Sequence, residues 1–372
     1  MIEVREVKTK KEKKEFVNFP LKLYKNNPYF VPPLYSDEMA LFKENYVYYD
    51  QSEAIYFNAY LDGKMVGRIS GILQKASNEK WNQNRIRFTR FDAIDNQEVA
   101  NELFKSIEIW CKEKGMSEIV GPLGFSDLER EGLLIYGFDQ LSTFEEQYNY
   151  DYYQRLIENC GYEKEVDWVE SRLRLPAEID PRLERISGMM MKKYNLSFGK
   201  AKNVNEFIKK YGDQFFDILD KTYDKIYGTV PFSDRMKQML IKNFKLILAI
   251  DKVSVIVDEN DRVVCFGLVF PAIGEALQKS GGRLTIPTLI KLLKVIKNPK
   301  VIDLGLIGVL PEYQMKGISS ALIAKILSIL KEGKIEYAET NLNLETNLNI
   351  QNQWKNFDAV QHKKRRCFIK KI

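Results

Sequence analysis

Residues 301–330 constrain the fold of this 372-residue chain more than any other stretch. The segment opens with an apolar run rich in β-branched residues, which is typical of a short buried strand ending at Pro311. A polar loop runs to Gly317, and apolar residues then recur at helical spacing, at Ile318, Leu322, Ile326 and Leu330. Such a loop directs free backbone N–H groups and the positive end of a helix dipole at one point. The segment therefore predicts an anion site that suits a pyrophosphate.

This segment resembles the acyl-CoA-binding signature of the GNAT N-acyltransferase superfamily, in which a strand with Val-x-Pro-x-Tyr runs into Gln/Arg-x-x-Gly-x-Gly/Ala and a helix. The matching residues are Val309, Pro311, Tyr313, Gln314 and Gly317, with Ser319 where the family prefers glycine or alanine. The resemblance implies acetyl-CoA or a longer acyl-CoA as co-substrate. It implies the following cofactor-binding residues: Ile307, Gly308, Val309, Gln314, Met315, Lys316, Gly317, Ile318, Ser319 and Ser320. An ordinary strand-to-helix turn of an α/β fold is the alternative interpretation.

Two stretches of the chain repeat one order of predicted elements. The first contains a hairpin at 55–73, a strand at 86–93, a helix at 97–114, a strand at 119–122, a helix at 150–159 and a strand at 168–175. The second contains a hairpin at 252–270, a strand at 301–310, a helix at 318–330, a strand at 335–346, a helix at 348–357 and a strand at 361–371. The repeat predicts a tandem duplication.

The predicted fold class is α/β, with two tandem GNAT-like domains, each a mixed, mostly antiparallel sheet flanked by helices. We expect a degenerate N-terminal domain at 1–176 and a C-terminal domain with the acyl-CoA motif at 177–372, joined by the linker Pro176–Pro181. In the first half the position of the pyrophosphate loop is Asp92–Glu98, which has no glycine and three carboxylates. Such a loop would repel a phosphate, so we expect only the second half to bind CoA.

The first half also resembles a group of bacterial tandem-GNAT proteins described as N-acetyltransferases. The resemblance lies in three stretches, 67–73, 121–139 and 148–164. Some relatives in this group are associated with N-acylation of long-chain, sphingoid-type amines. The length of the acyl chain stays open.

Polar residues alternate along the strand expected at 335–346. Glu339, Asn341, Asn343 and Glu345 share one face at a period of two, which suits either a catalytic base with its partners or a solvated sheet face. We predict Glu345 as the base or substrate-ammonium ligand, with Glu339 second. Asn341 and Asn347 are predicted to bind the substrate.

The general acid is harder to assign from the sequence. In many GNAT enzymes a tyrosine seven residues after an asparagine donates the proton, and counting from Asn347 places Trp354 there. Tryptophan cannot protonate a thiolate, so Tyr313 and the lone His362 remain as substitutes, although His362 is expected to be an exposed strand residue. The adjoining basic run 363–366 could contact a nucleotide phosphate or an anionic membrane, or simply be solvated.

Two insertions could shape the acceptor site. The segment 121–139 is predicted to be an ordered loop, and with Phe125, Tyr136 and Tyr152 it could wall an acceptor pocket between the domains or pack between them. Residues 284–297 predict a basic amphipathic helix, with Lys291, Lys294 and Lys297 recurring among aliphatic residues. Such a helix packs on a sheet, covers an acyl chain or makes a peripheral membrane contact.

Composition bounds the remaining possibilities. With 45% hydrophobic and 29% charged residues, no apolar run of membrane-spanning length and no apolar signal-peptide core, the chain is expected to be cytoplasmic. The four scattered cysteines predict free thiols, and neither a metal nor a nucleic-acid partner is expected at a formal charge of +6.

The sequence thus predicts an acyl-CoA-dependent N-acyltransferase that moves an acetyl or longer acyl group to the amine of a small-molecule or lipid acceptor. One alternative is a Fem-type transferase that uses aminoacyl-tRNA, although such enzymes generally lack a good CoA loop. The other is an acyl-CoA-binding protein without catalysis.

Overall fold

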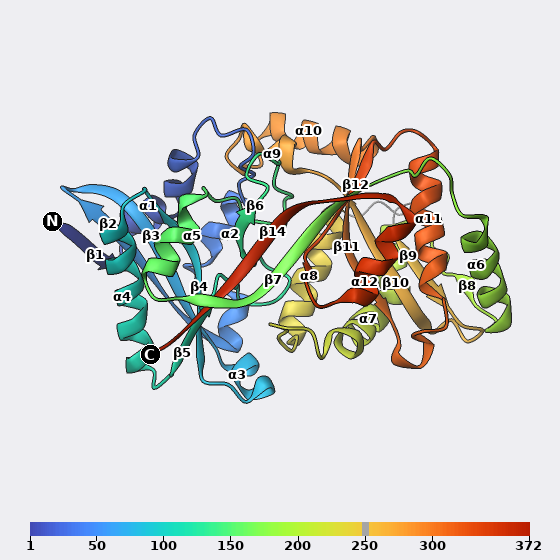
Figure 1. Cartoon of the computed structure of the whole chain (residues 1–372), viewed down its shortest axis with the longest axis horizontal. Helices are drawn as coiled ribbons and strands as arrows, with labels where there is room; N and C mark the ends of the chain where they lie inside the picture. Colours follow the sequence, from blue (N-terminus) through green and yellow to red (C-terminus); the bar gives the residue numbers. More distant parts are fainter. Residues whose placement is uncertain (248–252) are drawn as a thin grey trace. The chain divides into compact units, whose positions relative to one another are not determined.

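The computed structural model describes residues 1–247 and 253–372, and these residues form two compact units (Figure 1). Unit 1 comprises Met1–Val169, Gly274–Thr288 and His362–Ile372. Unit 2 comprises the described residues of Glu170–Ile273 and Leu289–Gln361. Compact units and repeated segments need not share a boundary, so the division of the repeats at residue 176 stays a prediction.

Unit 1 is built on a mixed sheet in the order β1-β2-β3-β4-β5-β14, with β6 paired to β14. Its strands are β1 (Ile2–Glu6), β2 (Ser52–Leu61), β3 (Lys64–Gln74), β4 (Arg85–Ala93), β5 (Glu118–Gly121), β6 (Leu133–Tyr136) and, from His362 on, β14 (Asp358–Lys371). Its helices are α1 (Lys10–Leu23), α2 (Tyr35–Ala40), η1 (Val47–Asp50), α3 (Lys75–Trp81), α4 (Gln97–Glu113), α5 (Tyr152–Asn159) and α9 (Gly274–Gln278). The β4–β5 pair is parallel, and the other pairs along this path are antiparallel.

Unit 2 has a sheet in the order β7-β12-β11-β10-β9-β8, with β13 paired to β7. Its strands are β7 (Glu163–Arg174, from Glu170 on), β8 (Ser197–Phe198), β9 (Ser254–Val257), β10 (Val263–Pro271), β11 (Val301–Val309), β12 (Tyr337–Thr340) and β13 (Asn343–Leu344). Its helices are α6 (Pro181–Lys193), α7 (Val204–Tyr223), α8 (Asp234–Ile247), α10 (Ile286–Lys297, from Leu289 on), η2 (Pro311–Tyr313), α11 (Ser319–Lys331), α12 (Leu348–Gln353) and η3 (Trp354–Asn356). Here too a single pair of the described path, β11–β12, is parallel.

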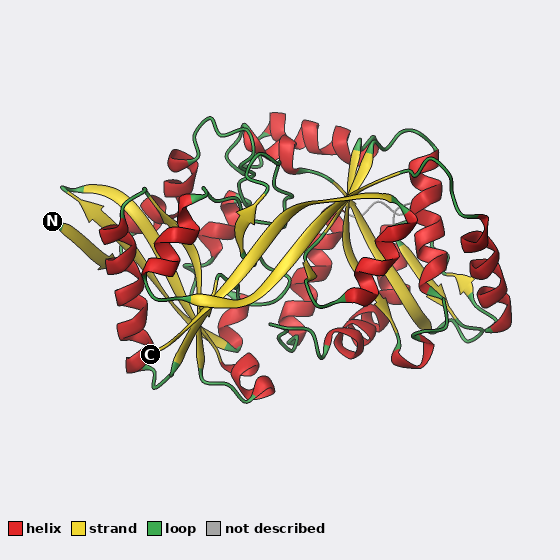
Figure 2. Ribbon diagram, viewed as in Figure 1, coloured by secondary structure: helices red, strands yellow, loops and turns green. Residues whose placement is uncertain are grey.

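The two sheets therefore share one pattern, which confirms the predicted fold class: two tandem mixed, mostly antiparallel sheets flanked by helices (Figure 2). A glycine in each unit marks the equivalence. A Cβ atom on Gly67 of β3 would lie 2.8 Å from Leu103 of α4, and one on Gly267 of β10 would lie 3.2 Å from Leu322 of α11. Both glycines allow the principal helix to pack closely on its sheet.

Each sheet is completed by a strand from the other half of the sequence. In unit 1, Phe368–Lys371 of β14 pairs antiparallel with β5. In unit 2, Arg172 and Leu173 of β7 pair antiparallel with β12. The chain thus passes from unit 1 to unit 2 within β7, contributes Gly274–Thr288 to unit 1, and passes from unit 2 to unit 1 again within β14.

Most predicted elements are confirmed to within a few residues, including the hairpin turn at Asp62 and Gly63, both of which have positive φ. The strand predicted at 335–346 is wrong beyond Thr340. Asn341 Oδ1 accepts a hydrogen bond from Leu342 N at 2.9 Å, and this local turn interrupts the strand before β13. Lys252, where the second hairpin was expected to begin, lies outside the described residues.

The described parts of the chain contain no helix that combines the length and the apolar character required to cross a bilayer. All four cysteines are free, as predicted.

Candidate functional site

An open backbone edge forms along the second half of β11. The strand pairs in parallel with β12 from Val301 to Leu304, where the described pairing stops, while β11 continues beside β10 to Val309. The register with β10 shifts at Gly305, because Leu304 faces Val269 and Leu306 faces Leu268. This bulge reverses the direction in which successive residues point their N–H and C=O groups.

The alternation beyond the bulge identifies the exposed groups. Leu310 N donates to Val264 O of β10 at 3.0 Å, so the residues one and three positions before it direct their backbone groups away from β10. These residues are Val309 and Ile307. Their N–H and C=O groups lie on the edge that β12 has left, where an extended amide-containing ligand could pair with them.

Tyr223, the last residue of α7, occupies part of this edge. Its hydroxyl donates to Ile307 O at 3.0 Å and accepts from Ile307 N at 3.3 Å. One phenolic oxygen thus satisfies both backbone groups of Ile307. This contact could not be predicted, because the two residues lie 84 positions apart and helical periodicity does not identify the strand that Tyr223 reaches.

The edge leads into the loop that precedes α11. Gly317 has a φ of +71°, in the left-handed region that favours glycine, and a Cβ atom there would contact Ile186 and Met190 of α6 at 3.6 Å. No side chain caps α11 with a hydrogen bond. Lys316 Nζ lies 5.0 Å from the ring centre of Tyr194 and 5.4 Å from that of Tyr313. The loop therefore combines a helix N-terminus without a side-chain cap and a lysine, which suits an anion.

The other predicted cofactor residues have varied surroundings. Gln314 Nε2 donates to Val309 O at 3.0 Å, and Ser320 Oγ donates to Gly317 O at 2.5 Å. Met315 is almost fully exposed, Ile318 is buried, and Ser319 begins α11. A Cβ atom on Gly308 would lie 2.3 Å from Phe266, so this glycine also has a packing role.

The candidate catalytic carboxylates lie beyond β12. Glu339 is buried and forms an ion pair with Arg172 of β7 at 3.0 Å. Glu345 is half-buried just after β13, where Gln351 Nε2 donates to its backbone oxygen at 3.2 Å. Because the strand ends at Thr340, the expected polar face that joins these residues at a period of two does not form.

Four other residues considered for catalysis or substrate binding are Asn341, Asn347, Trp354 and Tyr313. Asn341 bonds the next backbone N–H, and Asn347 caps α12 by accepting from Ile350 N. Trp354 is buried, and its indole N–H donates to Asn343 Oδ1 at 2.7 Å. Tyr313 lies in the anion loop, six residues after Ile307 along the chain.

The chain is similar in sequence to two bacterial proteins over most of its length. No known family model matches the chain. It is 27% identical over 384 residues to protein YghO of Escherichia coli strain K12, covering 99% of this chain and 95% of that protein. It is 26% identical over 323 residues to the bacterial ceramide synthase of Caulobacter vibrioides, covering 83% of this chain and 80% of that protein.

Among solved structures, a tandem GNAT protein from the clavulanic acid biosynthesis pathway, determined without acetyl-CoA, matches with a TM-score of 0.57. That match is 9% identical and covers 100% of this chain and 98% of the other. The chain has a tandem GNAT fold. A GCN5-related glucosamine N-acetyltransferase region of a fungal multi-domain β-N-acetylglucosaminidase gives a TM-score of 0.58 at 12% identity, with this chain matching 38% of that protein.

The tandem GNAT fold provides an equivalent edge in unit 1, where two tyrosines instead of one bond the equivalent residue. Ala93 of β4 pairs with Gly67 as Ile307 pairs with Gly267, and its N–H donates to Tyr153 Oη at 3.1 Å. Tyr152 Oη donates to Ala93 O at 2.8 Å. Asn96 then caps α4 by accepting hydrogen bonds from the first turn.

The remaining candidates from the first half are placed separately in unit 1. The Phe125 ring is fully buried and stacks on Tyr48, with 5.3 Å between ring centres, whereas Tyr136 at the end of β6 is exposed. Tyr152 bonds Ala93 of β4 as described. Their role in an acceptor pocket stays a prediction.

The expectation of an exposed His362 and a solvated basic run is wrong. His362 is 8% exposed, and the side chains of Lys363 and Arg365 are fully buried. The reason is that β14 pairs with β5 and β6 in the interior of unit 1, where Arg365 donates to Gln147 O and Arg366 bonds Asp167. Within the described residues, no group of three or more histidine, cysteine or acidic side chains is arranged to hold a metal ion.

Proposed function

We propose that the protein is an acyl-CoA-dependent N-acyltransferase whose donor site lies in unit 2. The observation that carries the proposal is the continuity between the edge of β11 that β12 leaves after Leu304 and the N-terminus of α11, which has no side-chain cap. On this edge the side chains of Tyr223 and Gln314 bond Ile307 and the Val309 carbonyl, and a bound ligand would replace these contacts. Pantetheine contains two amides that pair with a strand edge, and a pyrophosphate suits a helix start. CoA carries both groups in one extended molecule.

The order of groups along CoA assigns roles to the residues. With the phosphates at Lys316 and Gly317, the pantetheine runs back along Val309 and brings the thioester to Ile307. The Ile307 N–H would then donate to the thioester oxygen as negative charge develops on it. Tyr313 lies at the phosphate end of this arrangement, so its position favours a binding role over proton transfer.

Tyr223 is our candidate for the general acid. Its hydroxyl already lies beside the N–H that would hold the thioester oxygen. In the reaction the acceptor nitrogen forms a bond to the acyl carbon and the carbon–sulfur bond breaks. The base takes one proton from the ammonium form of the acceptor. The departing thiolate takes the phenolic proton, and the second proton lost from the acceptor nitrogen restores the phenol, so that free CoA and an amide result.

For the base, the geometry favours Glu345 over Glu339. Glu339 is buried and engaged by Arg172, which suits a carboxylate that fixes the strand ends. Glu345 is half-buried and lies outside the regular strands.

The acceptor is proposed to be a lipid amine and the acyl chain a long one. The relative named as a bacterial ceramide synthase supports this choice, since a ceramide is an N-acylated long-chain amine. The donor proposal does not depend on this choice of acceptor.

Calorimetric titration of acetyl-CoA and palmitoyl-CoA tests the donor site. Gly317→Glu places a carboxylate and a strained backbone in the loop, and we expect it to weaken acyl-CoA binding by about a hundredfold or more. Gly333→Glu is the matched control, because Gly333 also has a left-handed φ, of +73°, just after α11, with nothing close to an added Cβ atom. It should bind like the wild type.

Absence of binding by the wild type would refute the donor proposal. Binding without turnover against amines would favour a non-catalytic acyl-CoA-binding protein. Trp354 is consistent with that alternative, because it stands where many GNAT enzymes have the acidic tyrosine and its indole N–H is bonded to Asn343.

A further inference from the structure

Helix α10 exposes a continuous aliphatic stripe. The side chains of Ile286, Leu289, Ile290 and Leu293 are 76%, 44%, 63% and 67% exposed. Their spacing of three and four residues places them on one face of the helix, and Thr288 on the opposite face is 4% exposed. These four side chains are therefore not packed in the core, whereas Leu292, Val295 and Ile296 of the same helix are half-buried.

Lysines accompany this stripe. Lys297 follows Leu293 by one turn on the same face, and Lys294 and Lys291 lie progressively to one side of it. All three are exposed, the helix contains no acidic residue, and no ion pair to them occurs among the described residues. The helix thus presents an aliphatic face with a positive flank.

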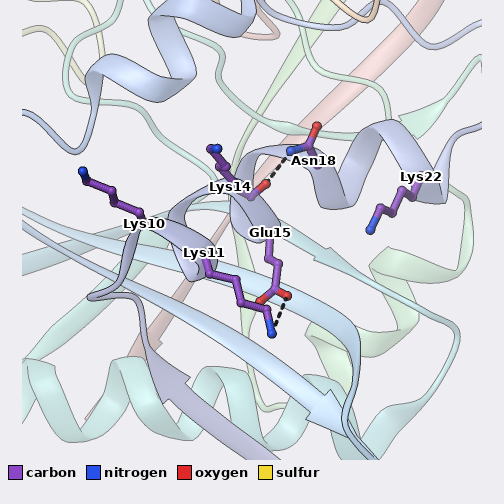
Figure 3. A pocket seen from close by; sticks show the side chains of 6 residues that line it. All are labelled: Lys10, Lys11, Lys14, Glu15, Asn18 and Lys22. Atoms are coloured by element: carbon purple, nitrogen blue, oxygen red, sulfur yellow. Dashed lines mark hydrogen bonds and ion pairs between the residues drawn. The ribbon is translucent and has the colours of Figure 1, made fainter.

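More positive charge lies next to the segment that leads into α10. In unit 1, Arg283 donates to Asn18 of α1 at 3.0 Å. Asn18 lines a shallow hollow on α1 together with Lys10, Lys11, Lys14, Glu15 and Lys22 (Figure 3). Glu15, the single acidic residue in this lining, lies 3.9 Å from Lys11 Nζ and accepts from Tyr60. The hollow therefore has a net positive charge.

We propose that α10 docks the protein on an anionic lipid surface, with the aliphatic stripe in the boundary between headgroups and acyl chains. Four exposed aliphatic side chains supply apolar area for insertion, and the lysines attract anionic headgroups. A protein partner is less well matched, because protein interfaces are depleted in lysine and enriched in aromatic residues, and α10 has no aromatic residue. This inference does not depend on the proposed chemistry.

Flotation of the full-length protein with vesicles tests the proposal. We expect binding to vesicles of phosphatidylcholine with phosphatidylglycerol, weaker binding to pure phosphatidylcholine, and a loss of binding as salt rises. Leu293→Glu should weaken partitioning by about tenfold or more without changing the melting temperature. Ile109→Glu is the matched control, because Ile109 on α4 is 51% exposed and lies outside the stripe.

Three results would overturn the proposal. The first is no binding of the wild type to anionic vesicles, and the second is equal binding of Leu293→Glu and the wild type. The third is a wild-type dimer in solution that Leu293→Glu converts to a monomer, which would make the stripe an interface between two copies of the chain.

Discussion

The starts of α4 and α11 occupy equivalent places in the two units, but they are built differently. Asn96 caps α4 by accepting from Glu98 N and Val99 N at 2.9 and 3.4 Å, whereas α11 has no side-chain cap. Before α4, two tyrosines bond Ala93; before α11, Tyr223 alone bonds Ile307. One fold thus provides two similar edges, which differ in the side chains that bond them and in the cap of the helix that follows.

Asp92, the first residue of the segment Asp92–Glu98 in unit 1, has a structural role. Asp92 is 7% exposed and accepts from Arg68 Nε at 2.8 Å and from Tyr24 Oη at 2.9 Å. Burial raises the pKa of Asp92, although Arg68 and its hydrogen bonds act in the opposite direction. Asp92 pairs with Arg68 as Leu306 pairs with Leu268, so this carboxylate lies at a strand position and not at the equivalent of the anion loop.

The largest expected effect follows from Asp92→Ala. Removing this carboxylate takes the 2.8 Å ion pair from the buried Arg68, which keeps the Phe16 carbonyl at 3.0 Å and Glu38 at 3.7 Å. The free energy of unfolding should therefore fall by about 3 kcal/mol, while acyl-CoA affinity should not change. Urea denaturation and calorimetry measure the two quantities. Asp95→Ala is the control, since Asp95 is 53% exposed beside Arg155, and it should change stability by about 0.5 kcal/mol or less. Loss of acyl-CoA binding in a stable Asp92→Ala protein would place the donor in unit 1.

The next effect concerns Tyr223, the side chain at the open edge. Tyr223→Phe should lower kcat by about a hundredfold, because the departing thiolate loses its proton donor, while acyl-CoA affinity should be equal or higher. Steady-state kinetics and calorimetry separate the two effects. Tyr211→Phe removes another hydroxyl of α7, whose partner at 3.3 Å is Asp261, and should leave kcat unchanged. An unaltered kcat in Tyr223→Phe would show that another group protonates the thiolate.

Acid should affect unit 1 through Asp167. Burial tends to raise the pKa of Asp167, but hydrogen bonds from Arg366 and Lys364 outweigh it and hold the pKa at about 2. Because this value is below that of the unfolded chain, the resulting stability, about 2 kcal/mol, is present above about pH 4 and is lost as the pH falls towards 2. Urea denaturation of Asp167→Asn should show lower stability near neutral pH and a smaller dependence between pH 4 and 2. An unchanged pH dependence would mean that the basic run of β14 is neutralised elsewhere.

The smallest expected effect is that of Lys316→Gln in the anion loop. Loss of one charge near a phosphate should weaken CoA binding about three- to tenfold. Binding of S-acetyl-pantetheine, which lacks the phosphates, should not change. Equal weakening of both ligands would remove Lys316 from the phosphate site.

Local features of the two units could be predicted from the sequence, whereas contacts between distant parts of the chain could not. The strand, loop and helix at 301–330 and both hairpins could be predicted, because local periodicity and turn residues determine them. The closure of the edge by Tyr223 could not, since it depends on a contact across 84 positions. The burial of Lys363 and Arg365 was equally hidden, because their partners are backbone oxygens of residues near 140–147.

The exchange of strand ends has a consequence for biosynthesis. The edge of β5 in unit 1 is covered by Phe368–Lys371 of β14, and nearly all of unit 2 is translated between these two segments. While unit 2 emerges from the ribosome, the nascent unit 1 presents an unpaired strand edge, the kind of surface that chaperones shield and that otherwise promotes aggregation. Unit 1 is therefore completed only after unit 2 has been synthesised, although most of its sequence is made first.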